Sequence, residues 1–326
     1  MNKPKLSIIM PVYNAEDYLQ EAIESVLNQS FTDFEFIIVY DSSFDNSLKI
    51  INNYNDERIE VIENKKRIGL VKSLNKAVRY ARGEYIARQD ADDVSLPNRL
   101  ELQLEFLEEH PEVALLGTGV CVINEKGETV EKRIMHPCPK KSLLKGNRFI
   151  HGSVMFRKSV MDELGTYNEV FKNSEDYELW LRFSLKYDVK NLTLPLYKLR
   201  SHSGSISSAK IEEQQMYAVL ARKLAMNEIK KEALLKLQEQ PLKFYQRLNL
   251  SDKTMFHKAV AYSHSQNNDL PSFRRESFKV FRLNPFDLEN DFQLVSALFG
   301  LRGVRATHQL YRHARYVLQK IFKVEI

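Results

Sequence analysis

The chain has 326 residues, of which 43% are hydrophobic and 28% are charged, and its formal net charge is +5 at pH 7. This composition is that of a globular protein with enough apolar residues for a core, so it excludes a disordered, collagen-like or disulfide-rich chain. Six Arg or Lys and one Glu lie in residues 300–326, an excess as large as that of the whole chain. Because the remainder is balanced, we expect no general attraction to nucleic acid.

The cysteine content and the apolar runs predict a cellular location. Cys121 and Cys138 form no metal-binding or redox motif, which is typical of free thiols in a reducing compartment. The apolar run at residues 6–10 is too short for a signal peptide, and Val113–Ile123 is shorter than the roughly 20 residues that span a bilayer. We therefore predict a cytoplasmic protein, with at most a peripheral contact to the inner face of the cell membrane.

The first half of the chain alternates short apolar runs with amphipathic stretches. Apolar residues recur at helical spacing around residues 18–27, after Asp45, and around residues 71–78. Strands are predicted at residues 6–10, 34–39, 59–62 and 84–87. Strand–helix–strand repetition at this spacing predicts an α/β fold with a mainly parallel sheet flanked by helices.

Further elements follow this repeat. A helix is predicted to begin near Ser95 and Pro97 and to end before Pro111. Strands are predicted at Val113–Ile123, after a turn at residues 124–128 and around residues 153–157, and another helix near Ser174. Residues 203–208 predict a loop that closes a first domain, residues 1–208, and helical signals dominate a second region, residues 209–326.

Polar residues follow three of the predicted strands. Residues 11–14 follow the first strand, residues 41–43 the second, and residues 90–93 the fourth. Ligands of parallel α/β sheets bind in the crevice at the carboxyl ends of the strands. The three clusters are therefore expected to line one site.

The acidic cluster has two interpretations. Asp93 or Ser95 can cap the helix that follows, which is a purely structural role. Alternatively, Asp90 and Asp92 gather Mg²⁺ or Mn²⁺ beside a diphosphate, since hard cations bind carboxylate and phosphate oxygens. Such a cation would neutralise charge on a leaving diphosphate.

Tyr13 and Asp41 are the residue types of a nucleobase pocket. An aromatic ring can stack on a pyrimidine, and a carboxylate can accept its imide N–H. Each residue has a simpler alternative, because Tyr13 can pack at a strand end and Asp41 can begin a turn.

Four stretches together resemble glycosyltransferase family 2, the inverting enzymes of the GT-A fold. They are residues 7–14 (SIIMPVYN), 39–45 (VYDSSFD), 83–93 (GEYIARQDADD) and 174–182 (SEDYELWLR). The resemblance covers roughly residues 4–208. It implies Asp176 as the catalytic base and Mn²⁺ or Mg²⁺ as the cofactor. It also implies a nucleotide-sugar site made by Pro11, Val12, Tyr13, Asp41, Asp90 and Ala91, and a metal bound by Asp92 and His202.

The chain departs from the family pattern at two places. Tyr40, Ser42 and Phe44 replace the Asp, Gly and Thr that are frequent in the second motif, so only Asp41 is carried over. Leu74 stands where relatives have an arginine that meets the donor phosphates. Lys72 can substitute for it, or can be an ordinary solvated lysine.

Asp176 and its neighbours are the candidates for the acceptor side. Asp176 opens a helix, where an acid can simply complement the helix dipole. The dipole would keep it ionised at neutral pH, as a base that deprotonates an acceptor hydroxyl requires. Glu175 and His151 are assigned to acceptor binding by the same resemblance.

The last segment predicts a basic amphipathic helix. Apolar residues share one helical face over residues 310–323, with basic residues elsewhere. Such a helix can lie on an anionic membrane surface or dock on its own domain.

Within the family, the motifs most resemble bacterial β-1,3-N-acetylglucosaminyltransferases of lipooligosaccharide synthesis. This implies UDP-GlcNAc as donor and a terminal galactose of a glycan or lipid-linked glycan as acceptor. A galactosyl- or glucosyltransferase is the alternative. A haloacid dehalogenase-type phosphatase is a remote one, because Arg88 and Gln89 separate Asp90 from its strand. A non-catalytic binder is disfavoured by the presence of Asp176.

Overall fold

The computed structural model describes residues 3–135, 140–202, 211–229, 241–266 and 269–283. The chain divides into a first unit, residues 1–203 with 221–230, and a second unit, residues 204–220 with 231–326. The predicted loop at residues 203–208, with its domain boundary, the basic helix at residues 310–323 and Cys138 lie outside the described residues.

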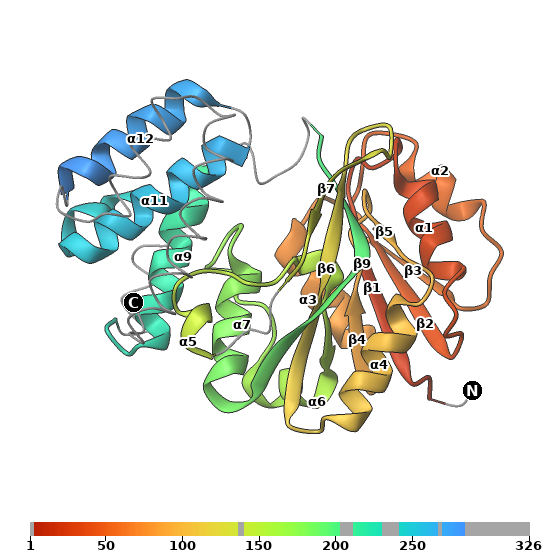
Figure 1. The fold of residues 1–326 in the computed structure, drawn as a ribbon. Helices are drawn as coiled ribbons and strands as arrows, with labels where there is room; N and C mark the ends of the chain where they lie inside the picture. Colours follow the sequence, from red (N-terminus) through yellow and green to blue (C-terminus); the bar gives the residue numbers. More distant parts are fainter. Residues whose placement is uncertain (1–2, 136–139, 203–210, 230–240, 267–268, 284–326) are drawn as a thin grey trace. The chain divides into compact units, whose positions relative to one another are not determined.

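The described part of the first unit is built on a nine-stranded sheet (Figure 1). The order across the sheet is β3-β2-β1-β4-β8-β6-β9-β5, and β7 pairs with β6. The strands are β1 (Leu6–Val12), β2 (Phe34–Tyr40), β3 (Ile59–Glu63), β4 (Tyr85–Arg88), β5 (Val94–Ser95), β6 (Val113–Ile123), β7 (Thr129–Arg133), β8 (Met155–Arg157) and β9 (Asp188–Arg200). Strands β3, β2, β1 and β4 pair in parallel, whereas β8 is antiparallel to β4 and β6.

Helices flank this sheet, as predicted. They are α1 (Leu19–Leu27), α2 (Ser47–Asn52), α3 (Leu70–Tyr80), α4 (Arg99–Glu109), α5 (Lys140–Leu143), α6 (Lys158–Leu164) and α7 (Glu175–Lys186), with a 3₁₀ turn η1 (His151–Ser153). Helix α1 buries Leu19, Ala22, Ile23 and Val26, the spacing of an apolar stripe that faces a core. Every residue of β2 is buried, which is typical of a parallel strand covered on both faces.

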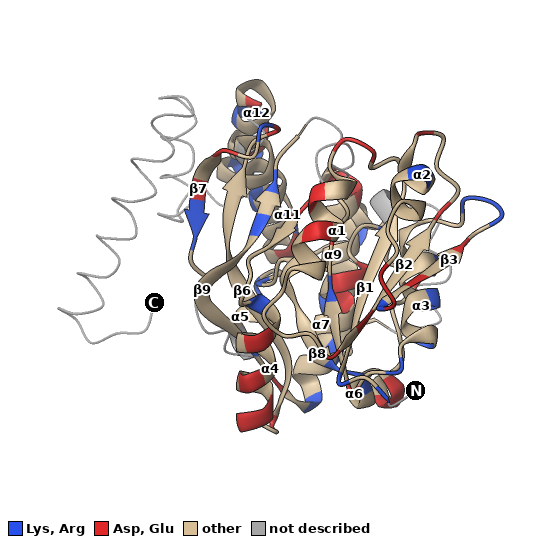
Figure 2. Cartoon of the chain, turned by 90° about the vertical axis from the view of Figure 1, so that its right-hand side faces the viewer, with Lys and Arg blue, Asp and Glu red and all other residues tan. Residues whose placement is uncertain are grey.

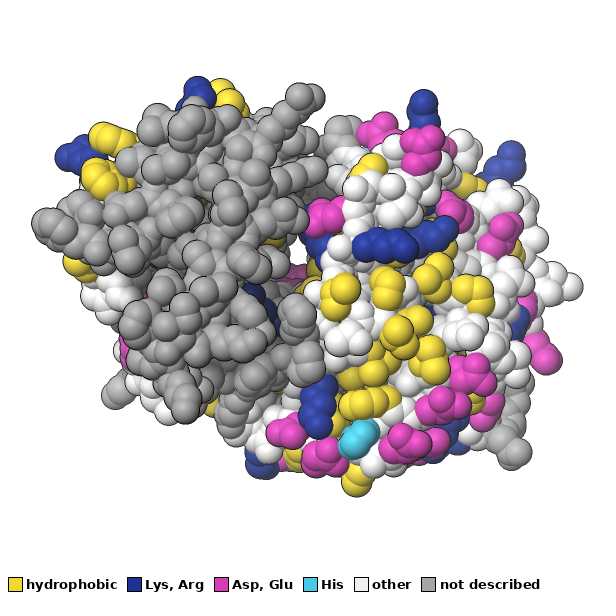
Figure 3. All heavy atoms as spheres, viewed as in Figure 1, with side chains coloured by type: hydrophobic (Ala, Val, Ile, Leu, Met, Phe, Trp, Pro, Cys, Tyr) yellow, Lys and Arg dark blue, Asp and Glu magenta, His cyan; other side chains and the backbone are white. Residues whose placement is uncertain are grey.

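The part of the sheet that is formed by residues after Asp93 differs from the prediction. The helix expected near Ser95 begins at Arg99, because Val94 and Ser95 form β5 and pair with β9. The sequence did not indicate β9, although it pairs along the length of β6. Pro195 and register shifts around Gly119 interrupt its alternation. Figure 3 shows hydrophobic side chains gathered over β9 and α4, and Leu194 of β9 is 51% exposed.

The described part of the second unit is helical, as the sequence predicted for this region. It contains a 3₁₀ turn, η2 (Pro241–Arg247), and helices α11 (Leu250–Gln266) and α12 (Leu270–Leu283), while helix α9 (Ile211–Ala225) begins in it. Its apolar core contains a cluster of buried side chains, which are Ile211, Met216, Val219, Leu248, Phe256 and Val260. None of the described helices is long and apolar enough to cross a membrane.

Candidate active site

The ends of β1, β2 and β4 meet at one edge of the sheet. Val12 pairs with Tyr40 across β1 and β2, and the N–H of Asp41 donates to the Val12 carbonyl at 2.9 Å. On the other side of β1, the N–H of Gln89 donates to the Ile9 carbonyl at 3.1 Å. The structure thus brings the three polar clusters to the same edge, with Pro11 and Val12 as the last residues of β1.

Two buried arginines lie beneath the Asp90–Asp93 turn. The Arg88 side chain is fully buried, and its Nη2 donates to Asp90 Oδ1 at 2.6 Å. Arg99, the first residue of α4, donates to the Arg88 carbonyl at 2.6 Å and to Ser95 Oγ at 2.7 Å. Burial lowers the pKa of Arg99 to about 10, so it keeps its charge at neutral pH. Both guanidinium groups therefore place fixed positive charge below the acidic turn.

Asp90 occupies space that depends on Gly152. The Asp90 N–H donates to the Tyr197 hydroxyl at 3.1 Å, and burial raises the pKa of the Asp90 carboxyl, although Arg88 opposes the rise. A Cβ at Gly152 would lie 2.2 Å from the Tyr197 hydroxyl and 2.6 Å from Asp90 Oδ2. Glycine is therefore required where η1 passes the acidic turn. Ala91, the next residue, is partly buried against the core.

We expect Gly152→Ala to displace Asp90 and to reduce strongly the sugar-transfer activity that the sequence motifs imply. The overlap should also lower the free energy of unfolding by about 1–3 kcal/mol. Gly117→Ala is the matched control, because its Cβ would overlap Asn191 Oδ1 at the same 2.2 Å but meets neither Asp90 nor Tyr197. Activity is measured at a temperature at which both variants are folded. Equal loss of activity in the two variants would contradict a specific role for Gly152.

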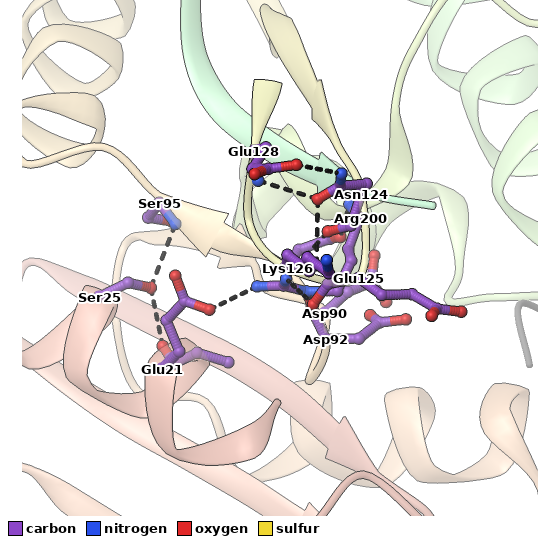
Figure 4. Close-up of polar contacts among 12 residues, drawn as sticks. Glu21, Ser25, Asp90, Asp92, Ser95, Asn124, Glu125, Lys126, Glu128 and Arg200 are labelled. Atoms are coloured by element: carbon purple, nitrogen blue, oxygen red, sulfur yellow. Dashed lines mark hydrogen bonds and ion pairs between the residues drawn. The ribbon is translucent and has the colours of Figure 1, made fainter. Parts of the chain in front are cut away.

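Asp92 and His202 are brought together, as the metal-site hypothesis requires. His202 Nε2 lies 2.9 Å from Asp92 Oδ2. Arg200 fixes the turn from below: its N–H donates to Asp93 Oδ1 at 2.7 Å and its Nε to the Asp92 carbonyl at 2.8 Å. Its Nη2 pairs with Glu21 of α1, and Figure 4 shows this guanidinium beside Asp92. The acidic turn is therefore held by side chains from separate elements.

Asp92 and His202 fit two coordination positions of a divalent cation whose other positions are filled by a bound ligand. Among the described residues, no three His, Cys, Asp or Glu side chains form a metal cluster. Asp92 and His202 nevertheless present an oxygen and a nitrogen 2.9 Å apart. Adjacent ligands of an octahedral ion, at about 2.1 Å each, have about this separation. Burial and the charges of Asp92 and Asp90 raise the pKa of Asp93 well above its usual value, so negative charge is crowded here.

The loop of residues 64–69, between β3 and α3, is tied to Asp41. The buried Asp41 carboxylate accepts the N–H groups of Ile68 and Gly69, both at 2.8 Å, and Asn64 Nδ2 at 2.9 Å. The ring of Tyr13 lies nearby, with the Arg67 guanidinium 3.9 Å from its centroid. Asp41 thus has a structural role in the loop, and its contact with a nucleobase stays a prediction.

Helix α3 carries Leu74 at the position of the arginine that is frequent in the family, and Lys72 two residues before it. Leu74 is fully buried. Lys72 is half-exposed, with its Nζ 3.8 Å from Glu169 Oε2. The next residue of the motif, Asn75, is bonded to both the N–H and the carbonyl of Tyr167, at 3.0 and 2.9 Å. A contact of Lys72 with donor phosphates therefore stays a prediction.

The first two residues of α7, Glu175 and Asp176, both carry carboxyl groups. Asp176 accepts the Tyr177 N–H at 2.6 Å and Asn147 Nδ2 at 2.8 Å. Burial raises the pKa of Asp176 to about 6, and these hydrogen bonds oppose the rise. Burial and Asp176 raise the pKa of Glu175 to about 8, and its buried Oε2 has no hydrogen-bond partner in the part of the chain that the structure describes. Asp176 is thus the group of the pair that is ionised at neutral pH.

His151 lies in an aromatic cluster behind this turn. Its Nε2 is 3.0 Å from the Tyr167 hydroxyl, and its ring meets Trp180 edge-on at 6.0 Å. Burial, together with the charge of Arg88, lowers the pKa of His151 well below its usual value. A neutral imidazole with a tyrosine partner suits hydrogen bonding to a hydroxyl-rich ligand.

The sequence did not indicate several residues that shape this site. Tyr197, Gly152 and Arg99 come from β9, η1 and α4, and each reaches the acidic turn only through tertiary packing. The one local signal was Arg88 in an otherwise apolar strand, since a buried arginine requires an acidic or carbonyl partner.

Comparison of the sequence with known proteins gives one family. The model described as "Glycosyl transferase family 2" matches residues 7–165. A putative glycosyltransferase of Bacillus subtilis, EpsE, is 42% identical over 209 residues, which cover 62% of this chain and 75% of EpsE. The O-antigen biosynthesis glycosyltransferase WbnJ of Escherichia coli is 36% identical over 212 residues, which cover 61% of this chain and 81% of WbnJ.

Solved structures share the fold at low sequence identity. S. aureus TarS, residues 1–349 in complex with UDP-GlcNAc, matches with a TM-score of 0.57 and 19% identity, over 95% of this chain and 92% of that chain. The mannosyltransferase PcManGT from Pyrobaculum calidifontis, in complex with GDP-Man and Mn²⁺, matches with a TM-score of 0.53 and 17% identity, over 92% and 87%. The predicted GT-A fold is thus confirmed.

Proposed function

We propose a specific reaction for this chain, which belongs to glycosyltransferase family 2 and is a nucleotide-sugar-dependent glycosyltransferase. It transfers a sugar, with inversion, from a nucleoside diphosphate donor to a glycan hydroxyl in surface polysaccharide synthesis. The observation that carries the proposal is the sheet edge at which Tyr13, the Asp90–Asp92 turn and its His202 partner meet. WbnJ, by its name an O-antigen enzyme, supports the pathway class.

For the donor we propose UDP-GlcNAc, and for the acceptor a terminal galactose of a lipooligosaccharide or capsule glycan. The motif resemblance and the fold shared with TarS, which was solved with UDP-GlcNAc, support this choice. A galactosyl- or glucosyltransferase is the second candidate. PcManGT, which was solved with GDP-Man, is an example of the same fold with a different donor sugar.

Different residues of the chain bind the donor and the acceptor. Tyr13 stacks on the base, and Asp90 and Ala91 lie along the diphosphate. Asp92 and His202 would hold Mn²⁺ or Mg²⁺, whose positive charge offsets that of the leaving diphosphate. PcManGT, which was solved with Mn²⁺, supports the use of a divalent cation on this fold. Glu175 and His151 orient the acceptor.

Asp176 is the base of the reaction. It takes the proton of the acceptor hydroxyl as the oxygen attacks the anomeric carbon on the face opposite the diphosphate. The carbon–oxygen bond to the diphosphate breaks as the new one forms, so the anomeric configuration inverts. The hydrogen bond from Asn147 to Asp176 holds the carboxylate in place.

A donor screen tests the proposal as a whole. The chain is incubated with Mn²⁺ and with UDP-, GDP- and CMP-linked sugars, and release of the nucleotide is measured. We expect turnover of UDP-GlcNAc above the other donors. Turnover of GDP- or CMP-sugars alone would contradict the donor choice. Release of inorganic phosphate from sugar phosphates, without donor turnover, would contradict the transferase.

We expect Asp176→Asn to bind donor normally but to lose transfer by at least about 100-fold, because an amide cannot accept the proton. Donor affinity is measured by calorimetry and transfer by chromatography of the glycan product. Asp162→Asn, on the exposed surface of α6, is the matched control and should retain activity. An active Asp176→Asn enzyme would show that another group is the base.

The raised pKa of Asp176 predicts the acidic limb of the pH profile. The ionised base is present above pH 6 and is lost as the pH falls through about 6. The rate of transfer should then fall about tenfold per pH unit below that point. Because the Asn147 hydrogen bond lowers this pKa, Asn147→Ala should move the limb to higher pH. A rate that is constant down to pH 4.5 would argue against Asp176.

We expect Asp92→Asn to lose the turnover that depends on Mn²⁺, because the carboxylate oxygen beside His202 is lost. Turnover is measured across a Mn²⁺ titration at saturating donor. Asp162→Asn, on the exposed surface of α6, again controls for the loss of one charge. An unchanged Mn²⁺ dependence in Asp92→Asn would place the cation elsewhere.

A further inference from the structure

Arg67 covers one face of the tyrosine in the donor site. It lies in the loop of residues 64–69, and its guanidinium carbon is 3.9 Å from the centroid of the Tyr13 ring. Lys65 and Lys66 precede it and are exposed, as is Arg67. The loop between β3 and α3 therefore presents three consecutive cations, and Figure 2 shows this basic loop.

The backbone of this loop is fixed, but the Arg67 side chain is not. Immediately after Arg67, the N–H groups of Ile68 and Gly69 both donate to the buried Asp41 carboxylate at 2.8 Å. Among the described residues, Arg67 forms no ion pair, and its one recorded contact is the ring of Tyr13. The guanidinium can therefore leave the ring without a change in the loop.

Three other cations at this end of the sheet have acidic partners. Arg88 is paired with Asp90, and Arg200 with Glu21. Lys72 lies within 3.8 Å of Glu169. Arg67 differs from all three in that its charge is not offset by any described carboxylate. It is thus available to an anionic ligand that binds at Tyr13.

The contact between Arg67 and Tyr13 is weak enough to be replaced. An exposed cation–π contact changes an equilibrium constant by about 2- to 5-fold. The guanidinium also lies where a base stacked on that face of the ring would lie. A nucleoside must therefore displace Arg67 and gains nothing from its charge. A nucleoside diphosphate displaces it and brings negative charge within reach of the same side chain.

We propose that Arg67 is a specificity-determining residue of the donor site, which covers the stacking face of Tyr13 in the free chain and selects nucleoside diphosphates over nucleosides. The inference rests on the proposed function, since it takes Tyr13 as the base-stacking residue. Relatives have an arginine at the position of Leu74 in α3 that meets the donor phosphates. In this chain Arg67, in the loop before α3, supplies a positive charge to those phosphates.

The test compares the affinities of uridine and UDP, or of the matching pair for whichever base the donor screen selects. Calorimetry is carried out with Mn²⁺ on the full chain and on Arg67→Ala. We expect uridine to bind about 2- to 5-fold more tightly to the variant, because the ring is uncovered. UDP should bind about 10-fold more weakly, because a charge-assisted contact is lost. The two affinities thus move in opposite directions.

Lys66→Ala is the matched control, because it removes one charge from the same loop without a recorded contact to Tyr13. It should leave the affinity for uridine unchanged and should weaken the binding of UDP less than Arg67→Ala does. Parallel weakening of uridine and UDP in Arg67→Ala would overturn the inference, as would an equal effect of Lys66→Ala. If the unmodified chain binds no nucleoside diphosphate, the proposed function fails first, which is a different result.

Discussion

The acidic turn at Asp90–Asp93 places three carboxylates at the end of a buried strand, and the structure depends on the arginine that holds it. Arg88 is completely buried and donates to Asp90 Oδ1 at 2.6 Å. Removing one partner of such a buried pair costs about 3–5 kcal/mol, because the other charge is left without compensation. Arg99 and Arg200 add fixed donors below the same turn. The turn is therefore held at the sheet edge before any cation or diphosphate arrives.

This arrangement separates two kinds of residue at the site. The arginines and Tyr197 are buried and hydrogen-bonded to the protein, so they hold the geometry. Asp92 and His202 remain partly exposed and can meet a ligand. On the acceptor side, burial gives Asp176 a pKa of about 6. This value allows ionisation at neutral pH and a stronger proton affinity than an exposed aspartate has.

The sequence predicted the parallel strands and the meeting of three polar clusters, because both follow from local periodicity and from a general rule of α/β sheets. It could not predict β9, where Pro195 and register shifts interrupt the alternation. It also missed Gly152 and Tyr197, whose importance arises from close approach to Asp90. The helix dipole was expected to keep Asp176 ionised. Its pKa of about 6 leaves it ionised at neutral pH, but burial raises this pKa above the usual value of an aspartate. The sequence of α7 could not predict that rise, because it depends on the residues that cover the helix.

We expect a cation and a diphosphate to bind together at the edge formed by Tyr13 and the acidic turn. The most direct measurement is the thermal unfolding midpoint of the chain with Mn²⁺, UDP or uridine, alone and in combination. We expect Mn²⁺ and UDP together to raise the midpoint by more than the sum of their separate effects, whereas Mn²⁺ with uridine does not. Strictly additive effects of Mn²⁺ and UDP would contradict it.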